Sequence, residues 1–197
     1  AFSIVYGGIG FKAEITDFGH IGLFAEQIKN WQIIRGLSKF GSSKQDDFKV
    51  LNLFAYTGGS SLAAAQGGAQ VVHLDASKTS VAWARANAEI NGLKDAPVRW
   101  ITDDVQKFVA REVRRENKYH GIILDPPRKG AKDDLASIIN LSPKHIIYIS
   151  CDPTTCARDL LRLKAGYSII DIAGFDFFPD TYHIETVVIL KKKYNTV

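Results

Sequence analysis

The segment YISCDPTTCARD, residues 148–159, contains both cysteines of the chain. It follows an apolar run and precedes a stretch with helical spacing, so Cys151 falls where a buried strand ends and a helix begins. A thiolate in that place gains from the helix N-terminal dipole and could act as a nucleophile. The alternative is a packing role, which is common for free cysteines. We interpret Cys156, inside the helix, as a packing thiol.

Glycines and aspartates follow the ends of several predicted strands. After the first strand, Gly58 and Gly59 turn the chain into a helix. Glycine lets the backbone approach a ligand closely, and a helix N-terminus offers unpaired N–H groups. Acidic residues end the next three strands: Asp75, then Asp103 with Asp104, then Asp125. Each aspartate alone could cap a helix or form a turn, so only their succession indicates a ligand site.

Apolar runs alternate with helical patterns along most of the chain, and this alternation must position the residues above. We predict strands at 49–55, 70–77, 98–104, 120–127, 145–151, 167–178 and 185–193. We predict the intervening helices at 60–68, 79–92 (with Thr79 or Ser80 near the N-cap and Gly92 near the C-cap), 105–117, 133–141 and 154–166. Apolar strands separated by helices indicate a parallel sheet covered on both faces. Ligands bind such sheets outside the carboxyl ends of the strands.

The last of these strands is expected to run antiparallel, because residues 179–184 are too few to hold a crossover helix. The expected fold class is therefore α/β, with a Rossmann-like, mostly parallel seven-stranded sheet. Before it, residues 2–16 indicate two short strands around Gly-Gly, and 23–40 an amphipathic helix. The polar stretch 41–47 is a candidate linker. We therefore expect an N-terminal extension at 1–45 and a catalytic domain at 46–197.

The predicted site suits an adenosine ligand. The glycine turn lacks the full G-x-G-x-x-G pattern, which disfavours a pyrophosphate-bearing dinucleotide. Asp75 can bind both hydroxyls of a ribose, and Asp103 or Asp104 can accept from an adenine amino group. An adenosine without phosphates that carries a cationic centre suits this acidic edge, which predicts S-adenosyl-L-methionine. The expected cofactor contacts are Phe54, Ala55, Tyr56, Thr57, Gly58, Gly59, Asp75, Ala76, Ser77, Asp103, Asp104 and Val105.

Longer stretches resemble two families of RNA methyltransferases. Within residues 10–125, TDFGHIGLFAEQIKNW, VLNLFAYTGGSSLAAA, LDASKTSVAWARANAE and DDVQKFV resemble bacterial 23S ribosomal RNA 5-methylcytosine methyltransferases. From residue 122 onward, ILDPPRKG, YISCDPTTCARDL and FPDTYHIETVVIL resemble RNA 5-methyluridine methyltransferases. Both families have the class I, Rossmann-like fold and use S-adenosylmethionine. The split indicates either a natural hybrid or an engineered chimera, and the absence of methionine also fits a fragment.

The resemblance to the 5-methyluridine enzymes implies a covalent mechanism. Carbon 5 of a pyrimidine becomes nucleophilic after a thiolate adds to carbon 6, and a base then removes the carbon 5 proton. The matching motifs imply Cys151 as nucleophile and Glu185 as base. They imply that Asp125 and Pro126 line the pocket between the cofactor and the base. Asp125 is expected both to contact the cofactor and to take part in catalysis. Asp152 replaces the asparagine usual after this cysteine, and we expect it to raise the pKa of the thiol.

The same resemblance supplies further contacts. Pro127, Arg128 and Arg158 are expected to bind substrate. Arg128 would contact a phosphate or a nucleobase carbonyl, and the alternative is a surface ion pair. In the cytosine family the N-terminal segment borders the cofactor, which adds Phe18, His20 and Gln27, with core packing as the alternative for the aromatic residues. No Cys/His cluster indicates a metal site.

Charge and composition limit the partners. The net charge is +4 and the isoelectric point about 9.0, which permits contact with RNA. The basic stretches 111–118 and 191–193 are either solvated faces or phosphate contacts. No apolar run approaches the ~20 residues of a membrane span, and two cysteines make no disulfide framework. We expect a cytoplasmic monomer with an RNA substrate (rRNA or tRNA), and with no membrane or metal partner.

Three functions fit these observations. The first is an RNA methyltransferase acting on carbon 5 of a pyrimidine, with the catalytic half favouring uracil and the preceding half cytosine. The second is a domain that binds S-adenosylmethionine without efficient turnover, because we recognise in these residues none of the RNA-binding modules that both families carry. The third is methylation of another substrate on the same fold, since fold does not fix function.

Overall fold

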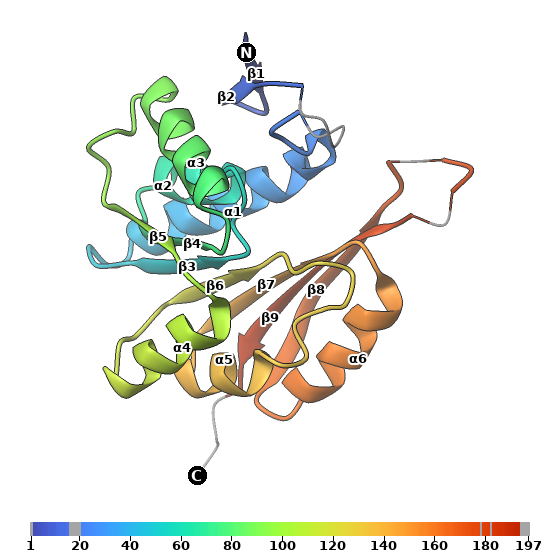
Figure 1. Ribbon diagram of the computed structural model, residues 1–197. Helices are drawn as coiled ribbons and strands as arrows, with labels where there is room; N and C mark the ends of the chain where they lie inside the picture. Colours follow the sequence, from blue (N-terminus) through green and yellow to red (C-terminus); the bar gives the residue numbers. More distant parts are fainter. Residues whose placement is uncertain (1, 16–20, 178, 182, 194–197) are drawn as a thin grey trace. The chain divides into compact units, whose positions relative to one another are not determined.

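The computed structural model describes residues 2–15, 21–177, 179–181 and 183–193 (Figure 1). The chain forms two compact units, Ala1–Asp103 and Asp104–Val197. The expected N-terminal extension lies within the first unit, and the domain boundary after residue 45 stays a prediction. None of the helices in the described ranges has the length and apolar content needed to cross a membrane.

The first unit joins a hairpin to a parallel sheet. In chain order its described elements are β1 (Phe2–Tyr6), β2 (Ile9–Ala13), η1 (Ala25–Gln27), α1 (Ile28–Ser42), β3 (Lys49–Leu53), α2 (Gly59–Gln66), β4 (Gln70–Asp75), α3 (Lys78–Ile90) and β5 (Val98–Thr102). The strand order is β5-β4-β3, and both neighbouring pairs are parallel. Successive residues of β3 from Val50 to Leu53 are all buried, as expected for a strand covered on both faces.

Small residues let α2 pack closely on α1. Ala63 and Ala64 are fully buried. A Cβ added to Gly67, at the end of α2, would lie 2.7 Å from the carbonyl oxygen of Arg35 in α1. The two helices therefore approach at a distance that larger side chains would prevent.

The second unit continues the alternation and then reverses it. Its described elements are α4 (Val105–Arg114), β6 (Gly121–Leu124), α5 (Leu135–Leu141), β7 (His145–Ser150), α6 (Pro153–Leu163), β8 (Tyr167–Phe175) and β9 (Glu185–Lys192). The strand order is β6-β7-β9-β8. β6 and β7 are parallel, whereas β9 is antiparallel to both of its neighbours, which confirms the direction predicted for the last strand.

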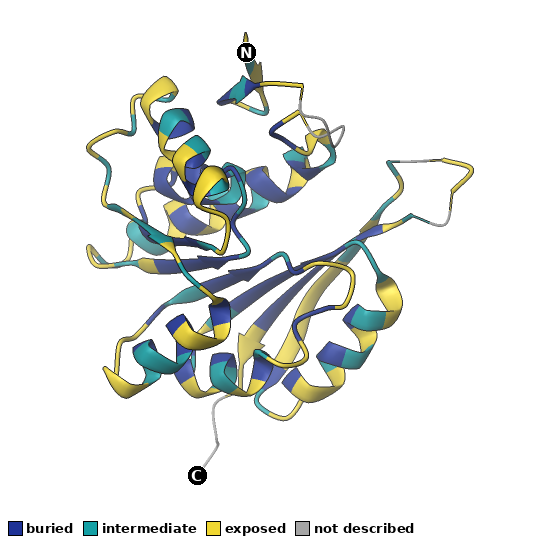
Figure 2. Ribbon diagram, viewed as in Figure 1, coloured by how far each residue is buried: buried dark blue, intermediate teal, exposed yellow. Residues whose placement is uncertain are grey.

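Burial differs strongly among these strands (Figure 2). β7 and the first part of β9 are buried, but most of β8 is exposed, including Ile169, Ile170 and Ile172. The register between β8 and β9 shifts between Ile169 and Asp171. Such an irregularity is a common feature of edge strands, where it hinders pairing with other chains.

Several predicted boundaries were wrong by a few residues. α1 extends to Ser42, so the linker predicted at 41–47 begins later. The N-cap of α3 is Ser77, whose hydroxyl accepts from the Ser80 N–H at 3.1 Å, and not Thr79 or Ser80. Gly92 lies near the C-cap, as predicted: it directly follows the C-cap residue Asn91 and has φ +67°. The first strand ends at Leu53, because the backbone of Phe54 is left-handed.

Candidate active site

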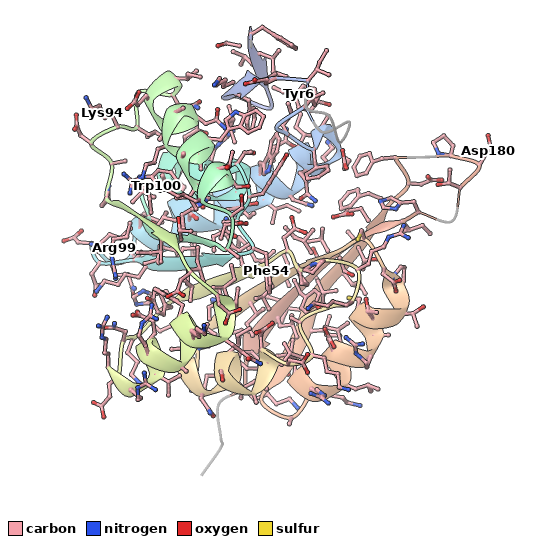
Figure 3. The ribbon with its side chains drawn as sticks, viewed as in Figure 1. Tyr6, Phe54, Lys94, Arg99, Trp100 and Asp180 are labelled. Carbon is pink, nitrogen blue, oxygen red and sulfur yellow. The ribbon has the colours of Figure 1, made fainter. Side chains whose placement is uncertain are left out.

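The loop after β3 has an unusual backbone. Phe54, Tyr56 and Gly58 have φ of 59°, 47° and 94°. Phe54 lies at the end of β3 (Figure 3). For a residue with a Cβ this conformation costs roughly 1–2 kcal/mol, and such strain persists only where neighbouring contacts fix it. A loop strained at two aromatic positions is a feature of ligand sites.

Asp75 fixes this loop from the end of β4. Its carboxylate accepts from the Tyr56 N–H at 2.8 Å and from the Ser77 N–H at 2.8 Å. The Ala55 N–H donates to the Leu74 carbonyl oxygen at 3.0 Å. Each carboxylate oxygen has a second acceptor position, which a ribose hydroxyl can use. Binding of a ribose by Asp75 stays a prediction, and the structure adds that Asp75 shapes the loop.

The N-terminal segment holds the same loop from its other side. The Thr57 hydroxyl donates to the Gly22 carbonyl oxygen at 2.7 Å, and the rings of Phe24 and Tyr56 lie 5.3 Å apart. A Cβ added to Gly59 would lie 2.7 Å from the indole of Trp31. Gly58 is therefore required by its backbone conformation and Gly59 by the close approach of Trp31.

The remaining predicted cofactor residues have mixed positions. Gln27 is buried, and its side-chain oxygen accepts from Asn30 at 2.6 Å. Asp104 caps α4 by accepting from the Lys107 N–H at 3.0 Å, which is the alternative that the sequence left open. The Asp103 N–H donates to the Asp75 carbonyl oxygen at 3.1 Å. Ala76 is exposed and Val105 is buried. Phe18 and His20 lie outside the described residues.

In the second unit, Cys151 and Glu185 occupy facing positions. Ser150, the last residue of β7, pairs with Thr186 of β9. Because the strands are antiparallel, the next facing positions are Cys151 and Glu185. Cys151 is half-buried and Glu185 is buried. This register confirms the prediction that β9 begins at the edge where β7 ends.

The thiol of Cys151 lies among charges of both signs. Burial raises its pKa above the ordinary value, and the carboxylates of Glu185 and Asp125 raise the pKa further. The positive charge of the Arg128 guanidinium lowers the pKa. Arg128 also donates to Nδ1 of His183 at 3.1 Å. The thiol could act as a nucleophile, a carboxylate as a base, and the guanidinium as a cation that stabilises the thiolate.

Asp152 does not act on the thiol as expected. The pKa of Cys151 is raised, as predicted, but by burial first and then by Glu185. The carboxylate of Asp152 caps α6 and accepts from the Thr155 N–H at 2.9 Å. That hydrogen bond lowers the pKa of Asp152 itself. The pKa of Cys151 is thus raised, opposite to the effect expected from the helix dipole.

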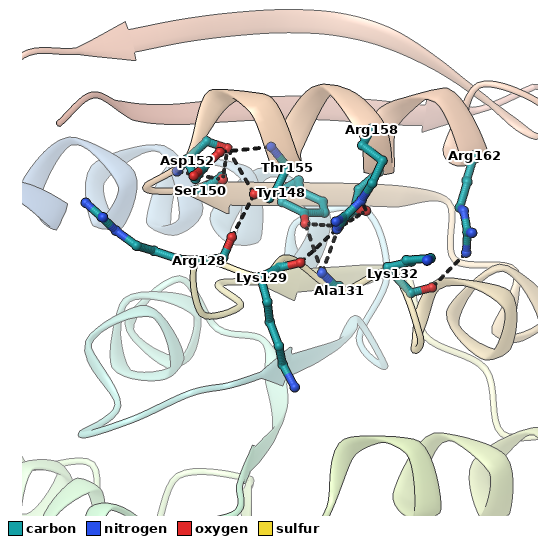
Figure 4. Close-up of polar contacts among 11 residues, drawn as sticks. Arg128, Lys129, Ala131, Lys132, Tyr148, Ser150, Asp152, Thr155, Arg158 and Arg162 are labelled. Carbon is teal, nitrogen blue, oxygen red and sulfur yellow. Dashed lines mark hydrogen bonds and ion pairs between the residues drawn. The ribbon is translucent and has the colours of Figure 1, made fainter. Parts of the chain in front are cut away.

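The segment after DPP is held along α6 (Figure 4). The contacts are Thr155 Oγ1 to the Arg128 carbonyl oxygen (2.9 Å), Arg158 Nη2 to that of Lys129 (2.8 Å), Arg162 Nη1 to that of Lys132 (2.9 Å), and the Ala131 N–H to Asp159 Oδ2 (2.7 Å). Arg158 was predicted to bind substrate, and that role stays a prediction. Its Nε and Nη2 already donate to the carboxylate of Asp159 and to the carbonyl oxygen of Lys129.

Asp159 and Tyr148 form the buried part of this arrangement, which the sequence reasoning missed. The fully buried carboxylate of Asp159 accepts from the Tyr148 hydroxyl at 2.6 Å. Burial and this hydrogen bond raise the pKa of Tyr148. The polar spacing 155, 158, 159 and 162 marks one helix face and could have indicated the contact. Cys156, buried on the same helix, fits the packing role predicted for it.

The parallel strands, the strained loop after β3 and the acid at the end of β4 define a class I methyltransferase fold. The SAM-dependent methyltransferase of Agrobacterium tumefaciens has this fold. It matches with a TM-score of 0.77 and 28% identity, over 98% of this chain and 70% of that chain. The tRNA (uracil-54, C5)-methyltransferase of Pyrococcus abyssi shares the fold with a TM-score of 0.72 and 22% identity, over 96% of this chain and 44% of that chain. The predicted Rossmann-like fold class is confirmed.

Residues 30–193 match the tRNA (Uracil-5-)-methyltransferase family model, so the chain belongs to this family. An RNA methyltransferase of Thermotoga maritima is 41% identical over 145 residues, covering 73% of this chain and 32% of the relative. The 23S rRNA (uracil(1939)-C(5))-methyltransferase of Marinomonas sp. is 36% identical over 162 residues, covering 82% of this chain and 36% of the relative. The chain thus spans about a third of the curated relatives that it matches. The family match also crosses residue 122, where the two sequence resemblances meet.

Proposed function

We propose that this chain carries out S-adenosylmethionine-dependent methylation of carbon 5 of uracil in RNA. The supporting observation is the facing register of Cys151 and Glu185 at the end of β7 and the start of β9. The positive charge of Arg128 favours the thiolate. Membership of the uracil-5 family favours uracil over cytosine. A cytoplasmic monomer that needs no metal or membrane partner is part of the same proposal.

The residues of the first unit fit the cofactor. The strained loop 54–58 presents backbone next to the carboxylate of Asp75, which keeps acceptor positions for a ribose. Asp103, Asp104, Asp125 and Pro126 stay candidate contacts. S-adenosylmethionine, when bound, supplies an electrophilic methyl group. The residues that would hold it are the loop residues and Asp75.

The protein side of the mechanism follows from three side chains. The Cys151 thiolate adds to carbon 6 of the uracil, which forms a C–S bond and moves the ring electrons toward carbon 5. After carbon 5 has gained a methyl group, the Glu185 carboxylate removes its proton. The electron pair left behind restores the C5–C6 double bond, and the C–S bond breaks to return the thiolate. The cation of Arg128 stabilises the thiolate before addition and after release.

RNA that contains 5-fluorouracil tests this proposal. Fluorine replaces the proton that Glu185 would remove, so elimination stalls and a covalent protein–RNA adduct accumulates. We expect an adduct with the wild-type chain and with Cys156→Ala, but none with Cys151→Ala. Denaturing gels and mass spectrometry of the modified peptide identify the attached residue. A chain that binds cofactor but forms no adduct with any fluorinated RNA would contradict the proposal.

A further inference from the structure

One face of α6 is dedicated to the 128–132 segment. Thr155, Arg158, Asp159 and Arg162 have the spacing i, i+3, i+4 and i+7, which places them in one row along a helix. Their partners are successive parts of the segment, and residue numbers rise together on both sides. The segment follows this row although it turns at 128–129, where the Gly130 N–H donates to the Pro127 carbonyl oxygen at 2.8 Å.

The centre of this row is the fully buried carboxylate of Asp159, and burying a charge costs free energy. Asp159 Oδ1 accepts from Arg158 Nε at 2.9 Å and Nη2 at 2.8 Å, and Oδ2 accepts from Tyr148 at 2.6 Å and Ala131 at 2.7 Å. A fully buried carboxylate is tolerated only when its acceptor positions are used in this way. The arrangement favours one geometry of the segment, because other geometries would remove the Ala131 N–H from the buried carboxylate.

Gly130 completes the fit. Its φ is +75°, and a Cβ there would lie 2.5 Å from Asp159 Oδ2 and 2.6 Å from Arg158 Nη2. Only glycine therefore lets the segment lie this close to the carboxylate while its neighbours make their hydrogen bonds.

The first contact of the row leads directly to the thiol. Thr155 donates to the carbonyl oxygen of Arg128, and the guanidinium of the same Arg128 is close enough to Cys151 to favour its thiolate. Thr155 also donates its backbone N–H to Asp152, the residue after Cys151. Thr155 thus contacts both Arg128, which carries the cation, and Asp152, which follows Cys151 in the chain.

We propose that Thr155, Arg158, Asp159 and Arg162 are positioning residues that hold the 128–132 segment so that the guanidinium of Arg128 reaches Cys151. For its role in catalysis this inference rests on the proposed function. The structural part of the inference is that these residues position Arg128 near the thiol. This part can be tested without methyl transfer. The competing explanation is that the contacts only stabilise the fold.

The test compares Thr155→Val with Thr154→Val. Both changes exchange a hydroxyl for a methyl group in the first turn of α6, and the side chain of Thr154 is exposed. The readout is the alkylation rate of Cys151 by iodoacetamide across pH, measured by peptide mass spectrometry. In Thr155→Val we expect the profile to move to higher pH and the rate at pH 7 to fall about threefold or more, because the cation no longer favours the thiolate. Thr154→Val should match the wild type.

A double-mutant cycle shows whether Thr155 acts through Arg128. Arg128→Gln should shift the profile in the same direction, and Thr155→Val added to it should shift the profile no further. Arg158→Lys should lie between the wild type and Arg158→Ala, because lysine keeps the charge but loses the forked donor. If Thr155→Val lowers the melting temperature but leaves the alkylation profile unchanged, the positioning role is overturned. If the profile shifts but the wild type forms no adduct with fluorinated RNA, the proposed function fails while the positioning role stands.

Discussion

At the scale of single residues, Cys151 and Glu185 are coupled by charge. The Glu185 carboxylate raises the pKa of the thiol, so in the proposed mechanism it would hold back the nucleophile that it would later help to release. With a raised pKa, the thiolate fraction at neutral pH is small and increases as pH rises. Adduct formation on fluorinated RNA should therefore accelerate with pH above 7.

Glu185→Gln separates the two effects. Removal of the negative charge lowers the pKa of Cys151 toward its ordinary value, so alkylation at pH 7 should become faster. Loss of the base should at the same time slow release, so that adduct accumulates on normal RNA. Parallel alkylation and gel assays measure both. Slower alkylation in Glu185→Gln would contradict the proposed proximity of carboxylate and thiol.

His73 gives a second residue-scale prediction, this time on stability. It is fully buried on β4, 3.0 Å from Ser61 Oγ and with its ring centre 4.9 Å from that of Trp100. Burial lowers its pKa to about 3, below the ordinary 6.5. The unfolded chain therefore binds more protons between these values, and the free energy of unfolding falls as pH decreases from 6.5. Denaturant titrations at pH 7 and 5 should show this loss, and it should shrink in His73→Gln.

The individual chemical residues were more predictable than their partners. The facing positions of Cys151 and Glu185 could be predicted because motif and strand direction agree. The hydrogen bonds from Arg158 to Lys129 and Asp159 could not be predicted. They depend on how a loop lies on a helix rather than on spacing along the chain.

At the scale of elements, the strands and helices were predictable, whereas the loops that carry the chemistry were not. Apolar periodicity located β3, β4 and β9 because each buries a continuous apolar run. The left-handed conformations of Phe54 and Tyr56 go against the local preference of aromatic residues, and only Asp75 and neighbouring contacts impose them. Local sequence carries no signal for such a conformation.

Gly130→Ala tests the segment on α6 as an element. The new Cβ would meet Asp159 and Arg158 in a left-handed conformation, so we expect a loss of about 1–3 kcal/mol in the free energy of unfolding. Gly36→Ala is the control, because Gly36 is inside α1 and its added Cβ meets nothing within 4 Å. This control should gain roughly 0.5–1 kcal/mol from helix propensity. Denaturant unfolding followed by circular dichroism measures both, and an unaffected Gly130→Ala would show that the segment can move away from α6.

At the scale of the whole molecule, family membership covers residues 30–193, yet the chain spans only about a third of its curated relatives. The sequence could predict the fold class because seven apolar strands and their connections determine it almost alone. It could not predict affinity for RNA, which depends on how charge is distributed over the surface. A net charge of +4 supports only a few phosphate contacts.

We therefore expect this chain by itself to bind RNA weakly and with strong dependence on salt. Contacts between Lys or Arg and phosphate release counterions from the RNA, so affinity falls as the salt concentration rises. A fluorescent RNA stem-loop should therefore dissociate markedly between about 50 and 200 mM salt. Arg114 and Arg115 at the end of α4 are exposed, although Arg115 also lies 3.7 Å from Glu112. If this end of α4 contacts phosphate, Arg114→Gln should reduce the slope of log affinity against log salt by up to about 1. Lys94→Gln, an exposed charge outside both basic stretches, is the control and should leave the slope unchanged. Anisotropy titrations at several salt concentrations measure these slopes, and a tight complex indifferent to salt would show that recognition does not depend on phosphate charge.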